Sequence, residues 1–431
     1  MKKRMTKVAA IAMAAALAAG TLAGCGGSGS SGGGQSAGAP AGGSGDSGKA
    51  AQAVTLNFAI PLAEEEWQVF REDILAPFEA ETGIKVNGIQ MENKDMESKL
   101  EALAQAGKHE IDVFAPSTVY LPGILGKDLA EDLTGQVTIP EAIPGNLYEE
   151  LMFDGKVTVV PIRPNVQTNY YNENKLNEYG LTPPKNWDEL LDFAKTLHEK
   201  EGVGRVAIQA ASGSALTITC LEFIRSAGGD PLVLNDAGSV EAFTFLQQLW
   251  PYLSPESKRA DFNGVNELLA TESIYYGSNW PFCATTVVKD GGKTEVKSYV
   301  GFEGPKGISK VTTTTVVGIA KGTEHKEEAL KFVEYLMSEK VQNVLFTKIG
   351  WAPARNDALG EVEEWQKPYI EDVMTALDFA QSRPIVPYWS DVDKAINDAF
   401  TEIVINGESD VQGILDKYHN TIEEAKQAKG E

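Results

Sequence analysis

The chain has 431 residues, with 61 acidic and 38 basic side chains that give a formal net charge of −23 at pH 7. A surface that binds nucleic acid must be basic to meet the phosphates, so this charge argues against a nucleic-acid-binding protein. Hydrophobic residues make up 42% and charged residues 23%, which is typical of a globular protein, and the length suits two domains.

Residues 1–24 have the pattern of a signal peptide. Lys2, Lys3 and Arg4 form a basic start, and an alanine-rich apolar run follows at 8–19. The run is shorter than the roughly 20 residues that span a membrane, and no stop-transfer pattern follows it. It ends in Leu-Ala-Gly-Cys at 22–25, which resembles the lipobox of bacterial lipoproteins. The resemblance implies a diacylglycerol on the sulfur of Cys25; the alternative is an ordinary secretory cleavage site beside an incidental cysteine.

Residues 26–53 are mostly Gly, Ser and Ala, with almost no large apolar side chain. Such a segment has nothing to bury against the entropy of ordering, so we expect a disordered tether that spans on the order of 30 Å. After Cys25 the chain contains only Cys220 and Cys283. We expect two buried thiols, with a single disulfide bridge as the alternative.

From residue 54 onward, strand-like and helix-like segments alternate. Strands are expected at 54–60, 84–89 and 111–115, and helices at 67–81 and 91–106. This alternation predicts a parallel sheet with helices on both faces, and ligands of such sheets bind beyond the carboxyl ends of the strands. The segments that follow strands are therefore candidate ligand contacts, at 64–67, 117–120, 212–214 and 279–280.

The sequence TPPKNWDEL at 182–190 predicts the start of a helix. Asn186 can cap it, Glu189 three residues later completes a capping box, and Trp187 and Leu190 begin an apolar stripe. Taken by itself, this pattern describes a structural helix and indicates no chemistry.

Together with Tyr-Tyr-Asn at 170–172, the same stretch resembles the signature of the extracellular solute-binding proteins that serve carbohydrate ABC importers. The resemblance extends in the same order over nearly all of 54–431, through segments at 78–86, 111–133, 272–280, 316–355 and 383–409. Two positions depart from the pattern. Asn186 stands where the family usually has Ser or Thr, and Asn165 stands where it often has an acid.

The resemblance implies an α/β protein with the two-lobed fold of the type II periplasmic binding proteins. Mixed, mainly parallel sheets would be flanked by helices, and the ligand cleft would lie between the lobes. We expect lobe 1 at 54–163 plus about 311–350, and lobe 2 at 164–310 plus about 351–431. Hinge closure requires that the ligand bind the closed form better than the open form.

A sugar has an apolar face and a rim of hydroxyl groups, so its site needs aromatic platforms beside polar groups. The resemblance makes Trp280 a stacking platform, with a core tryptophan as the alternative. Glu65 and Glu66 would reach the ligand, or else form the solvated N-terminus of a helix. Trp67 would stack or simply pack. Further candidates lie on the expected hinge strand, in the late segments and after other strands: Arg163, Asn165, Gln167, Trp351, Arg355, Arg383, Tyr388, Trp389, Asn279, Ser117, Thr118 and Ser214.

An enzyme is not indicated. The four histidines are far apart in sequence, and no His-Glu-x-x-His or Cys-x-x-Cys motif occurs, nor a Gly-x-Ser-x-Gly elbow between an expected strand and an expected helix. We therefore expect no catalytic residue, metal or cofactor. A surface glycosidase with two carboxylates facing a cleft stays open as an alternative, as does a ligand sensor for a membrane kinase.

The function expected from the sequence is that of a lipid-anchored receptor subunit of an ABC importer. It would capture a sugar or oligosaccharide, or alternatively another polar solute, and deliver it to the permease. We expect a monomer on the extracellular face of the cytoplasmic membrane, in a Gram-positive cell.

Overall fold

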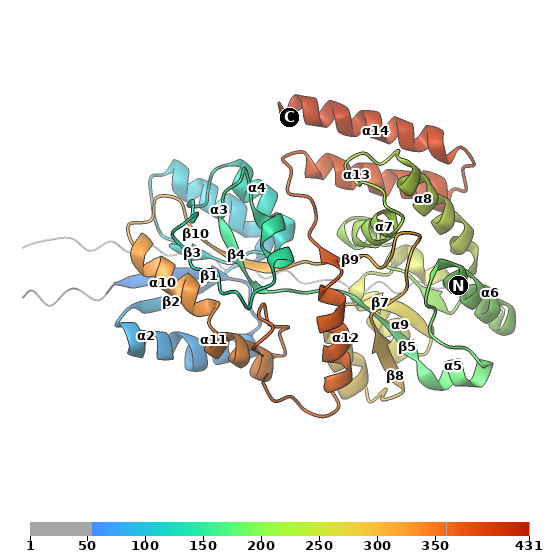
Figure 1. Ribbon diagram of the computed structural model, residues 1–431, viewed down its shortest axis with the longest axis horizontal. Helices are drawn as coiled ribbons and strands as arrows, with labels where there is room; N and C mark the ends of the chain where they lie inside the picture. The colour runs from blue at the N-terminus through green and yellow to red at the C-terminus, as the bar shows by residue number, and fades with distance from the viewer. Residues whose placement is uncertain (1–53, 359, 431) are drawn as a thin grey trace, which may run out of the picture. The chain divides into compact units, whose positions relative to one another are not determined.

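Two mixed β-sheets organise the computed structural model, which describes residues 54–358 and 360–430 (Figure 1). The expected signal peptide, Cys25 and the tether lie outside the described residues. We call each sheet with its helices a lobe. The expected α/β architecture is confirmed.

The sheet of the first lobe has five strands in the order β2-β1-β3-β10-β4. β1 pairs in parallel with β2 and β3, whereas β10 pairs antiparallel with β3 and β4, so β10 alone runs against the others. The strand bounds are β1 Thr55–Ile60, β2 Lys85–Gln90, β3 Val113–Phe114, β4 Val159–Arg163 and β10 Thr315–Ile319.

The predicted helix at 67–81 lies inside one longer helical run. It begins as α1 (Glu64–Val69), widens into the π-helical turn η1 (Phe70–Leu75) and continues as α2 (Ala76–Thr82), where Gly83 ends it with a φ of 74°. A left-handed residue after a helix is most easily a glycine, because glycine lacks Cβ. The other helical elements of this lobe are α3 Asn93–Gln105, η2 Thr118–Tyr120, α4 Leu121–Gly126, η3 Gly145–Leu147, η4 Glu149–Leu151, α10 Lys326–Leu336, α11 Glu339–Val344 and η8 Leu345–Ile349.

The sheet of the second lobe has four strands in the order β6-β7-β5-β8. β6 and β7 are parallel, whereas β5 is antiparallel to both β7 and β8. In each sheet all strands but one therefore run in the same direction, and the reversed strand is the first one the chain forms after crossing from the other lobe. The bounds are β5 Thr168–Asn172, β6 Val206–Ala207, β7 Tyr276–Asn279 and β8 Val296–Tyr299.

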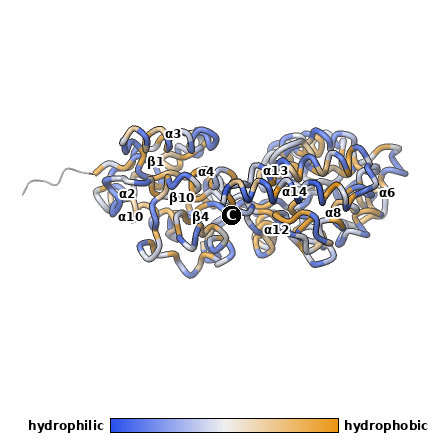
Figure 2. Tube along the Cα trace, turned by 90° about the horizontal axis from the view of Figure 1, so that it is seen from above, coloured by the Kyte–Doolittle hydropathy of each residue, from blue (hydrophilic) through white to orange (hydrophobic). Residues whose placement is uncertain are grey.

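Helices surround the second sheet. α13 packs against α7 and α14, and α14 also packs against α8, so the C-terminal segment lies beside a segment from the middle of the chain (Figure 1). Hydrophilic and hydrophobic residues both occur along α14, and its Leu415, Tyr418 and Ile422 are buried (Figure 2). The bounds are α5 Glu173–Tyr179, α6 Trp187–Glu201, α7 Ser214–Ser226, α8 Ala237–Leu249, η5 Trp250–Tyr252, η6 Pro255–Arg259, α9 Phe262–Ala270, η7 Ala284–Asp290, α13 Trp389–Phe400, η9 Thr401–Ile405 and α14 Val411–Ala428.

The start of α6 confirms the predicted cap. The side chain of Asn186 accepts a hydrogen bond from the backbone N–H of Glu189 at 2.9 Å, and Trp187 and Leu190 are buried. One detail differs from the expected capping box. The carboxylate of Glu189 accepts from the backbone N–H of Lys185 at 2.9 Å, because the chain before the helix folds back over its first turn.

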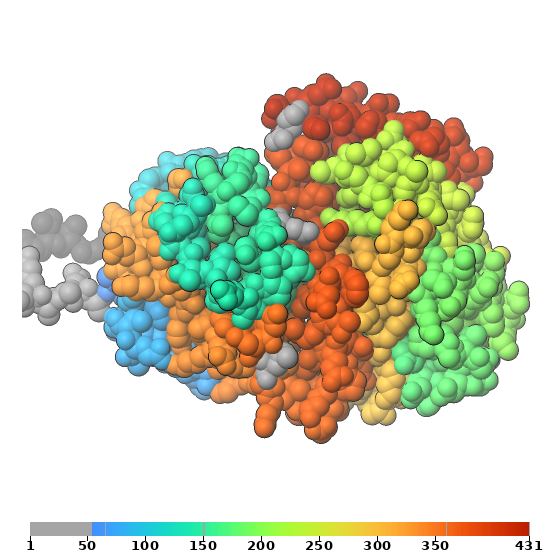
Figure 3. Space-filling view, in the orientation of Figure 1, coloured from blue at the N-terminus to red at the C-terminus, as the bar shows by residue number. Residues whose placement is uncertain are grey.

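The chain crosses between the lobes at 164–167 and 312–314, and returns through the segment that contains α12 (Lys367–Leu377). At the second crossing, β9 (Lys310–Val311) pairs in parallel with β11 (Ala380–Gln381). α7 holds both strands: Glu222 accepts from the N–H of Val311 at 3.3 Å, and Arg225 donates to the carbonyl of Ser382 at 2.7 Å. After the second crossing the chain forms α10 and α11, coloured orange, beside the blue N-terminal elements (Figure 3).

α12 contacts the cores of both lobes. Val373 and Leu377 belong to the apolar cluster of the first lobe. On the same helix, Tyr369 belongs to a cluster of the second lobe, and its hydroxyl donates to the carbonyl of Val296 at 2.6 Å. The division of 351–431 between the lobes therefore stays a prediction, since this helix serves both.

Cys220 and Cys283 are free and buried, as predicted. Burial raises the pKa of both thiols, so neither is a ready thiolate. None of the helices at 54–358 and 360–430 combines the length and the hydropathy needed to cross a membrane.

Candidate functional site

A cavity of about 520 Å³ is lined by residues of both lobes, and we call it the α12 cavity because α12 forms one wall. Four of the candidates chosen from the sequence line it: Glu66, Arg163, Asn165 and Trp351. Glu66 comes from the first turn of α1, Arg163 ends β4, and Asn165 lies on the first crossing. Segments far apart in the sequence therefore meet at one site.

Trp351 lines this cavity, but its indole ring is in contact with other side chains. Its indole N–H donates to the carboxylate of Glu66 at 2.8 Å. The guanidinium of Arg163 lies over the ring, 4.4 Å from its centroid, and the ring of Phe70 is 5.8 Å from it. Trp351 is itself buried in the first core. The ring therefore supports Arg163, and the guanidinium is the group presented to a ligand.

Arg163 is the strongest donor group in the cavity wall. Burial lowers its pKa, and the carboxylate of Glu66 opposes that shift. Glu66 is already engaged, because it also accepts from the N–H of Ala63 at 2.8 Å. Among the described residues, none accepts a hydrogen bond from Arg163 at hydrogen-bonding distance. Its N–H groups suit a ligand rich in oxygen acceptors.

Aromatic residues that the sequence did not single out also line the cavity. Phe282 on the second lobe is 37% exposed, and its ring meets that of Phe262 edge-on at 5.9 Å. Trp365 and Tyr369 add two more rings from the α12 segment. Phe282 follows the expected platform Trp280 by two residues, and this proximity is the feature of the sequence that could have pointed to it. Nothing in the sequence pattern marks Trp365 or Tyr369.

A second cavity of about 500 Å³ also receives residues of both lobes, and we call it the α13 cavity. Ser214, Arg383 and Trp389 line it from the second lobe, and Tyr120 lines it from the first. Arg383 donates from Nη2 to the hydroxyl of Ser214 at 2.5 Å and to its carbonyl at 3.3 Å. Tyr388, next to this wall, is buried in the second core.

Trp280 and Trp67 lie in the cores of the lobes. Trp280 is 8% exposed and packs in the second core, and its carbonyl accepts from the hydroxyl of Tyr170 at 3.4 Å. Trp67 is 4% exposed, and its indole N–H donates to Gln90 at 2.6 Å. Its ring fills the space beside Gly88, where an added Cβ would approach to 2.3 Å. Both positions favour packing, the alternative reading of each residue.

Ser117, Thr118, Gln167 and Asn279 line neither large cavity. Ser117 donates its N–H to Asn93 at 2.8 Å, and the hydroxyl of Thr118 accepts from the N–H of Thr314 at 3.2 Å. Asn279 donates to Asn266 at 2.7 Å. Gln167 is buried beside a void of only about 20 Å³.

Arg355 lines neither large cavity and is paired with a neighbouring carboxylate. It donates twice to Asp357, with both distances 2.8 Å, and this pairing raises the pKa of Arg355. It lines a separate cavity of about 250 Å³ on the first lobe. The side chain of Glu65 lies outside the described part of the chain.

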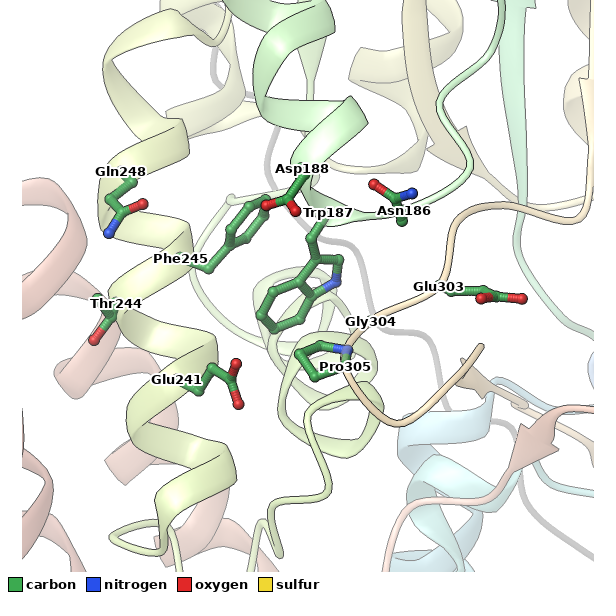
Figure 4. A pocket seen from close by; sticks show the side chains of 10 residues that line it. All are labelled: Asn186, Trp187, Asp188, Glu241, Thr244, Phe245, Gln248, Glu303, Gly304 and Pro305. Atoms are coloured by element: carbon green, nitrogen blue, oxygen red, sulfur yellow. The ribbon is translucent and has the colours of Figure 1, made fainter.

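A further cavity of about 460 Å³ lies on the second lobe, between the start of α6, α8 and the loop at 303–305 (Figure 4). Trp187 lies between Phe245 and Pro305 in this view, with its ring stacked on that of Phe245 at 4.5 Å. No candidate ligand contact lines this cavity, so we do not assign it to the site. Across 54–358 and 360–430, no three metal-ligating side chains lie close enough to hold an ion.

Comparison with known proteins matches residues 73–371 to the family model described as bacterial extracellular solute-binding protein. YcjN of Escherichia coli strain K12, provisionally named an ABC transporter periplasmic-binding protein, is 22% identical over 346 residues, covering 75% of this chain and 77% of YcjN.

Two solved structures resemble the fold. The cyclic alpha-maltosyl-1,6-maltose binding protein of Arthrobacter globiformis superposes with a TM-score of 0.75 at 18% identity, over 88% of this chain and 100% of its own. The maltose-bound MalE3 of T. maritima superposes with a TM-score of 0.69 at 22% identity, over 87% and 100%. At these identities the likeness establishes the fold.

Proposed function

Because the chain belongs to the bacterial extracellular solute-binding proteins, we propose that it is the receptor of an ABC importer for a sugar or oligosaccharide. YcjN is named for an ABC transporter, and the two structural relatives are named for a maltosyl sugar and bound to maltose. These names support the transport role and the carbohydrate class of the cargo.

One observation carries the proposal for the site: the α12 cavity joins a charged donor and aromatic rings from both lobes. A sugar can lay its apolar face on Phe282 and Trp365 while its hydroxyls accept from Arg163. Glu66 and Asn165 add oxygen and amide groups at the rim. Groups from two lobes around one ligand favour the closed form, because only that form makes all the contacts.

The receptor we propose is a lipoprotein. Cys25 would carry the acyl chains, and 26–53 would be the tether between the membrane and the lobes. It would deliver cargo to the permease as a monomer on the extracellular face of a Gram-positive membrane. The receptor would not alter its cargo. Another polar solute, a ligand sensor for a membrane kinase and a surface glycosidase remain the rival proposals.

A thermal-shift screen of the full-length chain against a panel of neutral mono- and oligosaccharides tests the proposal. One bound ligand stabilises the folded chain by RT ln(1 + [L]/Kd), or about 2.7 kcal/mol at a hundredfold excess over Kd. We expect at least one sugar to raise Tm, and Phe282→Ala to remove most of the rise. Phe379→Ala is the matched control, because Phe379 is exposed to a similar extent, 40%, and lines neither large cavity.

Two outcomes oppose the proposal. If no sugar shifts Tm, the carbohydrate class is wrong. If a bound oligosaccharide is recovered shortened, as read by mass spectrometry, the glycosidase rival is favoured. An equal loss of the shift in both phenylalanine variants would remove the α12 cavity from the site.

A further inference from the structure

The α13 cavity has the features of a site for a negatively charged group. Its wall includes Ser214 at the first turn of α7, Ser390 at the first turn of α13, and Arg383 between them. α7 has 13 residues and α13 has 12, so both are long enough for the N-terminal end to carry a positive field.

The first turn of α7 lacks a side-chain cap. Its N-cap is Gly213, which has no side chain to accept from the N–H groups of the first turn and lies at a φ of 101°. The N–H of Leu216 donates to the carbonyl of Ala211 at 3.3 Å, which leaves those of Ser214 and Ala215 without an acceptor among the described residues. Ser214 faces the cavity. Uncapped N–H groups at a helix start suit an oxyanion.

Arg383 supplies the second, independent observation. It is 7% exposed, it lines the cavity, and its Nε has no hydrogen-bond acceptor among the described residues. Its two hydrogen bonds both go from Nη2 to Ser214. A buried guanidinium with free donors is costly unless an acceptor arrives. Burial lowers the pKa of Arg383, with Asp393 and then Tyr120 opposing the shift.

The other charged residues that line the cavity do not form an ion pair with Arg383, so its positive charge is not neutralised by a direct partner. Glu97 is bound to Lys127 at 2.7 Å. Asp393 accepts from the hydroxyl of Thr217 at 2.7 Å and forms no ion pair with Arg383. Lys429 adds a further cation to the lining. In a chain with a net charge of −23, a wall with spare positive charge is unusual.

We propose that Arg383 and the first turn of α7 bind an oxyanion in the α13 cavity: a carboxylate, sulfate or phosphate group. This proposal deepens the proposed function. The bound group belongs either to an acidic sugar cargo, which rests on the proposed function, or to a free inorganic ion, which does not. The guanidinium of Arg383 keeps donors beyond its two hydrogen bonds to Ser214, and its charge strengthens a bond to an oxygen of such a group.

Isothermal titration calorimetry of the full-length chain distinguishes the sources, with galacturonate, galactose, sulfate and phosphate as probes at constant ionic strength in chloride. Galacturonate that binds about tenfold or more tightly than galactose assigns the anion to the cargo. Sulfate or phosphate that binds without sugar, and competes with galacturonate, assigns the site to a free ion. Both results support the oxyanion site.

The variant Arg383→Gln should weaken anion binding by about tenfold or more, since it removes the charge and the guanidinium. Arg383→Lys should keep part of the affinity, because it keeps the charge alone. The control is Arg259→Gln, which removes the same charge from an exposed residue paired with Glu256 outside this cavity. Circular dichroism and Tm confirm that each variant is folded.

The proposal is overturned if all three anions bind no better than chloride, or if Arg383→Gln and Arg383→Lys both bind anions like the wild type. Neutral sugars separate this failure from that of the receptor function. If they still raise Tm through the α12 cavity, the receptor stands and only the oxyanion site is lost.

Discussion

The indole of Trp351 is held on three sides, by Glu66 at its N–H, by Arg163 on one face and by Phe70 near the ring. A residue fixed in this way cannot also stack on a sugar. Its contribution at the residue scale is to hold the guanidinium of Arg163 over its ring, where a cation over an aromatic face is stabilised by about 0.5–2 kcal/mol.

Glu201, which lines neither large cavity, has a charged side chain with several partners in the fold. Its carboxylate accepts from the hydroxyls of Tyr179 and Tyr275 and pairs with Arg205 at 2.9 Å. The hydrogen bond from Tyr179 is the largest cause of its lowered pKa, with Tyr275 and Arg205 adding to it against burial. This carboxylate therefore links α6 to the end of α5, to the residue before β7 and to the residue before β6.

A depressed pKa in the folded state gives stability that is present above the unfolded pKa and is lost as pH falls through the folded value. We expect Glu201→Gln to lower the free energy of unfolding by about 1–3 kcal/mol at pH 7, because the side chain is only 14% exposed. The difference should shrink at about pH 3.5. Urea unfolding of both proteins at the two pH values measures it.

Glu424→Gln, at an exposed position on α14, is the control and should change stability little at either pH. A deficit in Glu201→Gln that is as large at the acid pH as at pH 7 would contradict the charge-based account.

The sequence could indicate candidate site residues where a motif marks a turn or the end of a strand. Glu66, Arg163 and Trp351 were all selected and do meet in one cavity. The pattern could not decide which side chain of a strand end faces the cavity. Trp280 turns into the core while Phe282, two residues on, is exposed, and that choice is made by packing across the whole sheet.

At the scale of elements, local signals were enough for the helix starts and the first strands. The cap at Asn186 and the strand at 55–60 agree with expectation because each depends on neighbours in sequence. The strand at 111–115 shrinks to Val113–Phe114, and β10 and β5 run against their sheets. Those features depend on which distant strands meet, which one sequence does not specify.

Removing the cap of α6 tests the energetic weight of such a signal. Asn186→Ala should lower the free energy of unfolding by about 1 kcal/mol, because the N–H of Glu189 loses its acceptor, while Asn186→Ser should cost little. Urea unfolding followed by circular dichroism gives both values.

Asn177→Ala, on an exposed position of α5, is the matched control and should leave stability unchanged or slightly higher, since alanine is the better helix former. If Asn186→Ala matches this control, the cap does not contribute.

At the scale of the whole molecule, α12 contributes residues to both cores, and side chains of α7 form hydrogen bonds with the segments beside the crossings. The crossings are the segments about which we propose that the lobes rotate, in a hinge motion of the kind that two-domain binding proteins undergo. We expect a sugar that raises Tm to reduce the radius of gyration of the chain in solution.

Small-angle X-ray scattering with and without that sugar measures the change. A sugar that leaves Tm unchanged serves as the control and should leave the profile unchanged. Identical profiles for the binding sugar would mean that the cargo is held without closure.

The burial of Cys220 and Cys283 makes the chain easy to convert into an optical reporter. Neither thiol is accessible to a maleimide dye while the protein is folded, so with Cys25 replaced by serine a single cysteine engineered at the cavity rim would take the fluorophore alone. The emission of that dye would then follow occupancy in real time, without a radiolabelled cargo.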